Sequence, residues 1–440
     1  MSAPESPLAA ASQWPTGLDE PVRTGHHGIS PDDIDPDAVK VLRRLSQFGY
    51  HAYLVGGGVR DLLLRRAPKD FDIATSARPA EMRRLFRNCR LIGRRFRLAH
   101  ICFADGKVIE VATFRDLPEH DEGDGPIQDD NAFGTPATDA VRRDFTVNAL
   151  FYDPVTDEVI DHVGGLEDLA ARRLRTIGDP VVRFREDPVR ILRAVKFAAR
   201  LDLNLDGPTE AAMRSEKSEL RKAAIPRLLE ELARMLWQGA AERSYELLAE
   251  LGLLELLLPE IAAFLGRPVD EPWKPLRNLL RVLDQRFSGE QQYPMGVLLA
   301  VLYWPLYQAI VAELPPRTDP SRLRRLAETL VAPAAIRLRI PRRDVGILIA
   351  ALEGQIRFEA ARRQKSTRVA FARSAAFPGV LDLFELRQEA EPISAEAAAA
   401  IHLLAKESPG ADVPPVGTLL DFEDLDDGEQ RRRKRRRRSS

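Results

Sequence analysis

The sequence predicts an α+β fold, in which a head with a small mixed sheet and helices is followed by an all-helical region. Short apolar runs of strand length alternate with helical patterns as far as about residue 165. After Pro188, apolar residues recur three and four positions apart to about Lys406, and strand patterns almost vanish. The chain has 440 residues, 44% of them apolar, which is enough for two or three domains.

Each element of the head follows from a local pattern. Helices are expected where apolar residues recur with helical spacing or where proline opens a turn, and strands where short apolar or alternating runs end in glycine. The expected elements are a helix over 36–48, a strand over 52–55, a helix over 59–64, a strand over 71–74, a helix that begins at Pro79, and a hairpin of 99–103 with 108–114.

These patterns divide the chain into five segments. Residues 1–33 lack periodicity and are expected to be disordered, and 407–440 form a charged tail with too few apolar residues to fold. Between them lie a head (34–180), a helical neck (181–270) and a helical C-terminal body (271–406). The longest apolar run, Met295–Ala312, is broken by Pro305, which favours a buried helix over a membrane span.

Composition excludes several classes of protein. No apolar stretch flanked by basic residues opens the chain, so no signal or transit sequence is evident and the cytoplasm is expected. The two cysteines, Cys89 and Cys102, exclude a disulfide framework and a four-cysteine metal site.

Charge is strongly segregated although the net charge is only −1. Between Arg60 and Arg97 there are twelve basic residues and four acidic ones, a balance of +8, and residues 431–438 are all basic. A basic face suits a polyanionic partner. The alternative is that these side chains are solvated helix faces.

The segment Lys69-Asp-Phe-Asp-Ile-Ala-Thr75 carries two carboxylates two positions apart. In a strand Asp70 and Asp72 point to one face, while Phe71 and Ile73 enter the core. Two neighbouring carboxylates suit a pair of Mg²⁺ ions that activate a hydroxyl and hold a phosphate. The pair alone is also compatible with an exposed strand edge.

Leu54-Val-Gly-Gly-Gly-Val-Arg-Asp61 precedes this segment. Glycines between a strand and a helix let backbone amides, here those of Gly57 and Gly58, approach a phosphate. Arg60, one turn later, is placed to reach a triphosphate. The spacing matches neither a Walker A loop nor a dinucleotide fingerprint, and a plain tight turn is the alternative.

Further polar residues complete the candidate site. Glu110 has the opposite phase to its apolar strand neighbours and is expected to be the third metal ligand. In Arg142-Arg-Asp-Phe-Thr-Val-Asn148, Asp144 is expected to cap a helix, and Arg143, Asp144 and Asn148 to serve triphosphate and ribose. Each string is also compatible with a purely structural role.

Arg185-Glu-Asp-Pro-Val-Arg190 offers an acceptor beside a donor. Pro188 is expected at the first helical position, with Asp187 as the cap and Arg190 in the first turn. Such a pair complements the edge of adenine, and equally that of cytosine, so it rejects guanine and uracil only. In the structural alternative, the two side chains cap the helix and pair with each other.

Taken together, the motifs from Tyr53 to Leu258 resemble the class II nucleotidyltransferases, which include bacterial poly(A) polymerases and CCA-adding enzymes. The resemblance implies a head with a five-stranded sheet, then neck, body and tail. It implies catalytic roles for Asp70, Asp72 and Asp144 and metal binding by Asp70 and Asp72. Arg143 then contacts ribose and phosphate, and Asp187 and Arg190 read the base in a neck that also binds RNA. Whether Glu110 or Asp144 is the third functional carboxylate stays open.

Residues 88–101 and the basic tail resemble the poly(A) polymerase branch. The expected activity is template-independent transfer of AMP from ATP to RNA 3′ ends, with Mg²⁺, or Mn²⁺ in its place. The expected partners are RNA, ATP and proteins of RNA decay, with neither DNA nor a membrane span. CCA addition to tRNA is the first alternative, and an inactive RNA-binding protein on the same fold is the second.

Overall fold

The structure is a computed structural model that describes residues 20–93, 98–104, 106–116, 133–287, 293–315, 318–361 and 377–391. It divides into two compact units. The first comprises Met1–Gly289 with Ala334–Ile340, and the second Glu290–Pro333 with Pro341–Ser440. The first unit contains all the candidate site residues.

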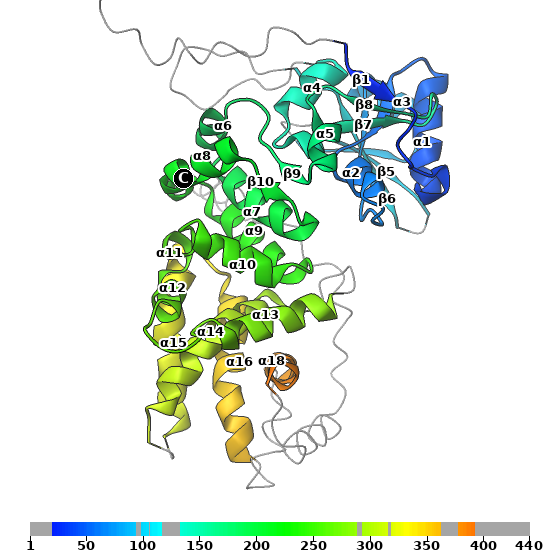
Figure 1. The fold of residues 1–440 in the computed structure, drawn as a ribbon. Helices are drawn as coiled ribbons and strands as arrows, with labels where there is room; N and C mark the ends of the chain where they lie inside the picture. Colours follow the sequence, from blue (N-terminus) through cyan, green and yellow to red (C-terminus); the bar gives the residue numbers. More distant parts are fainter. Residues whose placement is uncertain are drawn as a thin grey trace, which may run out of the picture. The chain divides into compact units, whose positions relative to one another are not determined.

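A mixed sheet forms the centre of the head (Figure 1). It has eight strands in the order β1-β8-β7-β2-β3-β6-β5-β4. Its strands are β1 (Val22–Thr24), β2 (Ala52–Val55), β3 (Ile73–Thr75), β4 (Cys89–Ile92), β5 (Leu98–Cys102), β6 (Val108–Thr113), β7 (Leu150–Asp153) and β8 (Glu158–Asp161). Only the β3–β6 pair is parallel. The mixed sheet was expected, whereas the count of five strands was wrong.

β1 also corrects the prediction of disorder for residues 1–33, as far as the described part of that segment is concerned. Val22–Thr24 pairs with β8, and a short 3₁₀ helix, η2 (Pro31–Asp33), follows. β1 has only three residues, too few to show an alternating pattern in the sequence. The strand therefore depends on hydrogen bonds to a partner far along the chain.

The helices of the head are α1 (Pro36–Gln47), α2 (Gly57–Leu63), α3 (Pro79–Leu85), α4 (Pro136–Arg142), the 3₁₀ helix η3 (Thr146–Asn148) and α5 (Gly165–Ala170). α1 shows why local patterns suffice. Asp35 caps its first turn through the amide of Asp37 at 2.8 Å, and Pro36 occupies the first position. Val41 and Leu45, four apart, are buried on one face.

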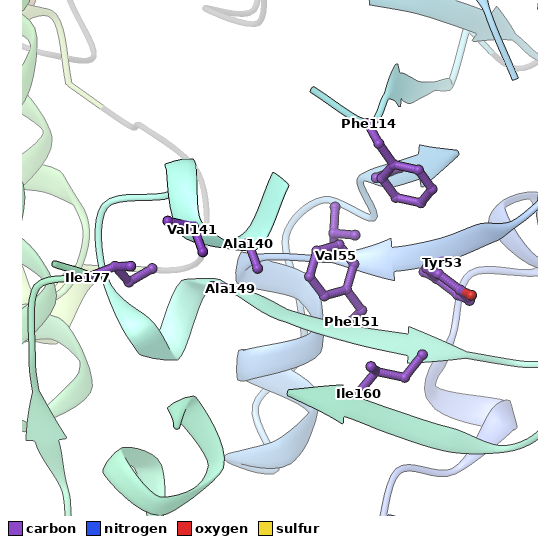
Figure 2. Packing of buried hydrophobic residues seen from close by; sticks show 10 residues of the cluster. Tyr53, Val55, Phe114, Ala140, Val141, Ala149, Phe151, Ile160 and Ile177 are labelled. Atoms are coloured by element: carbon purple, nitrogen blue, oxygen red, sulfur yellow. The ribbon is translucent and has the colours of Figure 1, made fainter. Parts of the chain in front are cut away.

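A buried cluster packs α4 against the sheet, as Figure 2 shows. Its members come from the central strands, from α4 and from the segments beside them: Tyr53, Val55, Ala74, Phe114, Ala140, Val141, Ala149, Phe151, Ile160 and Ile177. The rings of Phe114 and Phe151 meet edge to face at 6.4 Å. This packing holds the residues that follow α4 beside β2 and β7.

The neck is helical. Its helices are α6 (Pro180–Glu186), α7 (Val189–Leu201), α8 (Gly207–Glu216), the 3₁₀ helix η4 (Lys217–Lys222), α9 (Ile225–Trp237), α10 (Ala241–Glu250), α11 (Leu254–Leu257) and α12 (Pro259–Leu265). α13 (Lys274–Arg286), from the segment expected to open the C-terminal body, belongs to the same compact unit and packs on α9 and α10. Two short strands, β9 (Arg173–Leu174) and β10 (Asn204–Leu205), pair in parallel at its start. α7 packs on both α9 and α10.

The second unit contains α14 (Met295–Ala312), α16 (Arg342–Ala361), α18 (Phe377–Ala390) and the first part of α15 (Pro320–Arg337). A Cβ on Gly296 would lie 2.5 Å from the carbonyl oxygen of Asp344, so glycine permits the close approach of α14 to the start of α16. Within the described ranges, α14 alone is long and apolar enough to cross a membrane, and 67% of it is buried inside the protein.

Candidate active site

Asp70 and Asp72 lie between α2 and β3, and both are exposed. The strand begins at Ile73, two residues later than expected, and Phe71 is only partly buried instead of entering the core. The backbone nevertheless approaches strand geometry early, because the carbonyl of Asp72 accepts a hydrogen bond from the amide of Val55 at 3.0 Å. β2 therefore positions the segment that carries both carboxylates.

Glu110 lies on β6, the strand beside β3. The parallel register pairs Ile73 with Val111, which places Glu110 next to Asp72 across the two strands. On the other side, β5 places His100 opposite Glu110, with Nε2 3.2 Å from Oε1. His100 was not among the predicted site residues, because its position opposite Glu110 follows only from the hairpin register.

The carboxylates influence one another electrostatically. Although the residue is exposed, partial burial of its carboxyl raises the pKa of Asp72 to about 6, with further contributions from Glu110 and Asp70, while Arg143 acts in the opposite direction. Several negatively charged carboxylates close together are the ligands that a divalent cation such as Mg²⁺ prefers. Among the described residues, no group of three or more acidic, histidine or cysteine side chains is already closed around an ion position.

At two positions of the glycine turn, other parts of the chain come so close that a side chain would crowd them. Gly56 precedes α2 with φ of +71°, and a Cβ there would lie 3.0 Å from Nη1 of Arg143. A Cβ on Gly58 would lie 3.2 Å from the carbonyl oxygen of Asp70. Gly57 is the first residue of the helix. The turn thus brings Arg143 and the Asp70 segment to the start of α2.

Arg60 points into the head. It is 3% exposed and donates to Oδ1 of Asp61 at 2.8 and 2.7 Å and to Oδ1 of Asn148. Its guanidinium also lies 5.2 Å from the ring centre of Phe197 on α7. The sequence placed Arg60 toward a triphosphate, whereas in this conformation it joins the head to the neck.

Asp144 does not cap a helix as expected. α4 ends before it, and the short η3 follows. The carboxylate is buried and accepts hydrogen bonds from the Phe145 amide at 2.9 Å and from Asn148 Nδ2 at 3.0 Å. Arg193 on α7 contacts Oδ2 through Nε at 2.8 Å and Nη2 at 2.6 Å.

These contacts explain the ionisation of Asp144. Burial favours its neutral form, but Arg193 and the hydrogen bond from Asn148 outweigh burial and lower its pKa. Asp144 is therefore a charged group facing the neck. Arg143 donates to Asp139 at 2.9 Å and is the residue of this motif whose charge acts on Asp72.

Asp187 and Arg190 lie at the junction of α6 and α7. Asp187 accepts from the Val189 amide at 3.3 Å, but α7 begins at Val189, one residue later than expected. Arg227 on α9 contacts both oxygens of Asp187 at 3.0 and 2.8 Å, and Arg190 contacts Glu186 at 3.1 Å. The amide of Arg190 donates to the carbonyl of Asp187 at 3.0 Å, but the side chains of the two proposed base readers do not pair with each other.

Sequence reasoning missed Arg193, Arg200 and Arg227. Arg193 and Arg200 are seven apart, so they share one face of α7. Arg193 reaches Asp144, and Arg200 approaches Asp61 at 3.4 Å. Two arginines with that spacing, with Lys196 between them on the same face of α7, were the available signal. Arg227 gave no such signal, because its partner is 40 residues away.

Two family models match the chain. The Poly A polymerase head domain matches residues 52–175, and the model described as probable RNA and SrmB-binding site of polymerase A matches residues 202–265. Both matches fall in the unit that contains the candidate site.

Curated relatives include poly(A) polymerases and CCA-adding enzymes. Poly(A) polymerase I of Salmonella typhimurium is 43% identical over 288 residues, which cover 63% of this chain and 62% of the relative. Poly(A) polymerase I of Haemophilus influenzae is 40% identical over 66% of each chain. The CCA-adding enzyme of Bacillus pumilus is 38% identical over 50% of this chain and 54% of its own. The chain thus spans less than two thirds of the first of these relatives.

Solved structures with the same fold include CCA-adding enzymes. That of Bacillus stearothermophilus in complex with CTP has a TM-score of 0.59 and 26% identity, covering 85% of this chain and 82% of its own. That of Thermotoga maritima complexed with tRNA has a TM-score of 0.55, 22% identity, and coverage of 85% and 83%. These likenesses extend beyond the head into the helical region.

Proposed function

We propose that this chain, which belongs to the nucleotidyltransferase family of poly(A) polymerases and CCA-adding enzymes, adds AMP from ATP to RNA 3′ ends without a template. The observation that carries the proposal is the group of carboxylates around the start of the parallel strands β3 and β6, Asp70, Asp72 and Glu110, beside the glycine turn. The relatives named poly(A) polymerase I support the choice of ATP.

In this proposal Asp70, Asp72 and Glu110 hold the metal. Bound there, Mg²⁺, or Mn²⁺ in its place, supplies Lewis-acid activation of the RNA 3′ hydroxyl and neutralises charge on the phosphates. The hydroxyl attacks the α-phosphate of ATP in line, and pyrophosphate leaves. Arg143 lies beside the carboxylates and balances charge on the triphosphate, with the amides of Gly57 and Gly58.

Asp187 and Arg190 are proposed to read the adenine edge from the start of α7. Their polar pattern fits cytosine equally well, so preference for ATP requires a pocket of purine width. A smaller base would leave a void and misplace the α-phosphate, which is costly in rate at a phosphoryl-transfer centre. We further propose that the enzyme acts in the cytoplasm, lacks a membrane span, and works with proteins of RNA decay.

The test is incubation of the purified protein and Mg²⁺ with an unstructured RNA, a single-stranded DNA of the same sequence, and a tRNA that lacks its CCA end. Each NTP is supplied separately, and the truncated tRNA is also incubated with CTP and ATP together. The expected result is a long AMP homopolymer on RNA, little incorporation of CMP, and no extension of DNA.

Two other results decide between the alternatives. Restoration of CCA on the truncated tRNA, with a need for CTP and a stop at that length, would assign the chain to CCA addition. RNA binding without incorporation of labelled ATP under any metal condition would identify an inactive RNA-binding protein.

A further inference from the structure

The segment between α2 and β3 carries exposed basic residues immediately before Asp70. Arg65, Arg66 and Lys69 are all exposed. The segment touches the neck at two points. Nη1 of Arg66 donates to the carbonyl of Arg200 on α7 at 2.7 Å, and Nζ of Lys69 lies 5.4 Å from the ring centre of Trp237 on α9. The metal and base-reading roles proposed above use neither Lys69 nor Trp237.

Trp237 is the last residue of α9 and differs from its neighbours. Met235 and Leu236 are buried in the neck, whereas Trp237 is only partly buried. No acidic group pairs with Lys69 in the part of the chain that the structure describes. The pair therefore presents an aromatic ring and an uncompensated cation at the surface, next to the carboxylate segment.

We propose that Lys69 and Trp237 form a subsite for the RNA primer, which rests on the function proposed above. Consecutive Cα atoms are about 3.8 Å apart, so Lys69 lies beside the metal-binding Asp70. A strand whose 3′ hydroxyl reaches the metal passes this pair one or two nucleotides earlier. There Trp237 stacks on a base and Lys69 contacts a phosphate, the combination by which proteins hold single-stranded RNA without sequence preference.

The competing explanation is that the ring only packs against the stem of Lys69 and joins the neck to the head. A purely structural contact would change stability, and it would affect ATP and primer alike. A primer subsite would affect the primer alone. The experiment therefore separates the Michaelis constants of the two substrates.

The full-length variants W237A and W237F are assayed with an oligo(A) primer and ATP. W237A should raise the KM for primer about fivefold to a hundredfold, because removal of one base stack has that effect. The KM for ATP at saturating primer and kcat should stay near wild type. W237F keeps a stacking surface and should stay close to wild type. W273A is the matched control, since Trp273 is a partly exposed tryptophan elsewhere in the same unit.

Lys69 is tested by salt dependence. K69M should reduce the slope of log affinity for oligo(A) against log salt by about 0.7, as expected when one phosphate is no longer neutralised, and K69R should restore it. Unchanged primer KM and RNA affinity in W237A, or equal rises in the KM for primer and for ATP, would overturn the subsite.

Binding of oligo(A) without ATP separates this proposal from the proposed function. If wild type binds oligo(A) more tightly than W237A but neither incorporates AMP, the proposed activity fails and the subsite stands. If wild type incorporates AMP and W237A binds oligo(A) as wild type does, the subsite fails and the activity stands.

Discussion

At the residue scale, carboxylates of this site have two different environments. Partial burial of the Asp72 carboxyl, together with the neighbouring Glu110 and Asp70, raises its pKa to about 6. Asp144 is buried against Arg193, and its pKa is lowered. A carboxylate without a compensating cation gains most from a bound metal ion, whereas Asp144 already has its counter-ion. Glu110 is exposed beside Asp72 and is paired with His100 at 3.2 Å, not with an arginine, so this difference supports Glu110 over Asp144 as the third ligand.

Replacing either exposed carboxylate by its amide tests the metal role. D70N and D72N should each lower AMP incorporation at least a hundredfold, on the order of the ~3 kcal/mol that such electrostatic groups contribute to catalysis. Melting temperature should stay near wild type because both residues are exposed. D33N, at an exposed aspartate on η2, is the control. Activity close to wild type in either variant would contradict the assignment.

The third carboxylate is identified by metal titration. E110Q should raise the Mg²⁺ concentration needed for half-maximal activity about tenfold, since one charged ligand is removed. D144N should lower kcat or stability without that shift, because Asp144 contacts Arg193 and Asn148. The opposite pattern would make Asp144 the ligand.

At the element scale, α7 connects the base-reading end of the neck with the head. Besides Arg193, it carries Lys196, which is 3% exposed and lies 2.6 Å from Glu231 on α9. Arg193 also approaches Glu231 at 3.7 Å. Removing one member of a buried pair leaves an uncompensated charge, which costs more than removing both.

K196M should therefore lower the free energy of unfolding by about 3 kcal/mol, measured by chemical denaturation near neutral pH. The double variant K196M/E231M should recover most of that stability, because it buries no charge. An equal or larger decrease in the double variant would show that the pair contributes net stability.

The same pair predicts a pH dependence. Burial lowers the pKa of Lys196 to about 8, against a value of 10.5 in the unfolded chain. Between these values the unfolded chain holds more protons at this site, so stability should rise with pH across the window. K196M lacks this amino group. The free energy of unfolding of K196M, relative to that of wild type, should therefore decrease as the pH rises from about 8 to 10.5. A difference that stays constant with pH would contradict this.

At the scale of the whole molecule, the longest run of positive charge lies near the C-terminal end of the sequence. The run from Arg431 to Arg438 lies outside the described residues, and its role follows from composition. Replacing it by serines should weaken RNA binding and reduce the salt slope by about 0.7 for each phosphate that the tail neutralises, without changing the KM for ATP at saturating primer. Identical slopes for both proteins would exclude a role of the tail in RNA binding.

Local sequence sufficed for elements whose signals are short-ranged. α1 has its cap, its proline and its apolar face within twelve residues, and the hairpin of β5 and β6 alternates as a half-buried ribbon should. The resemblance added the motif roles. Together they led to the α+β head, the helical region, the likeness to poly(A) polymerases and the position of Glu110 beside Asp72.

Tertiary structure decided what depends on distant partners. β1 exists because β8, about 135 residues away, supplies its hydrogen bonds, and no window of sequence contains both. Arg60 lies inside the head because Asp61 and Asn148 satisfy its donors there, and Asp144 faces the neck because Arg193 reaches it from α7. A charged side chain takes its position from the counter-charges that folding brings near, and the sequence pattern around it does not specify them.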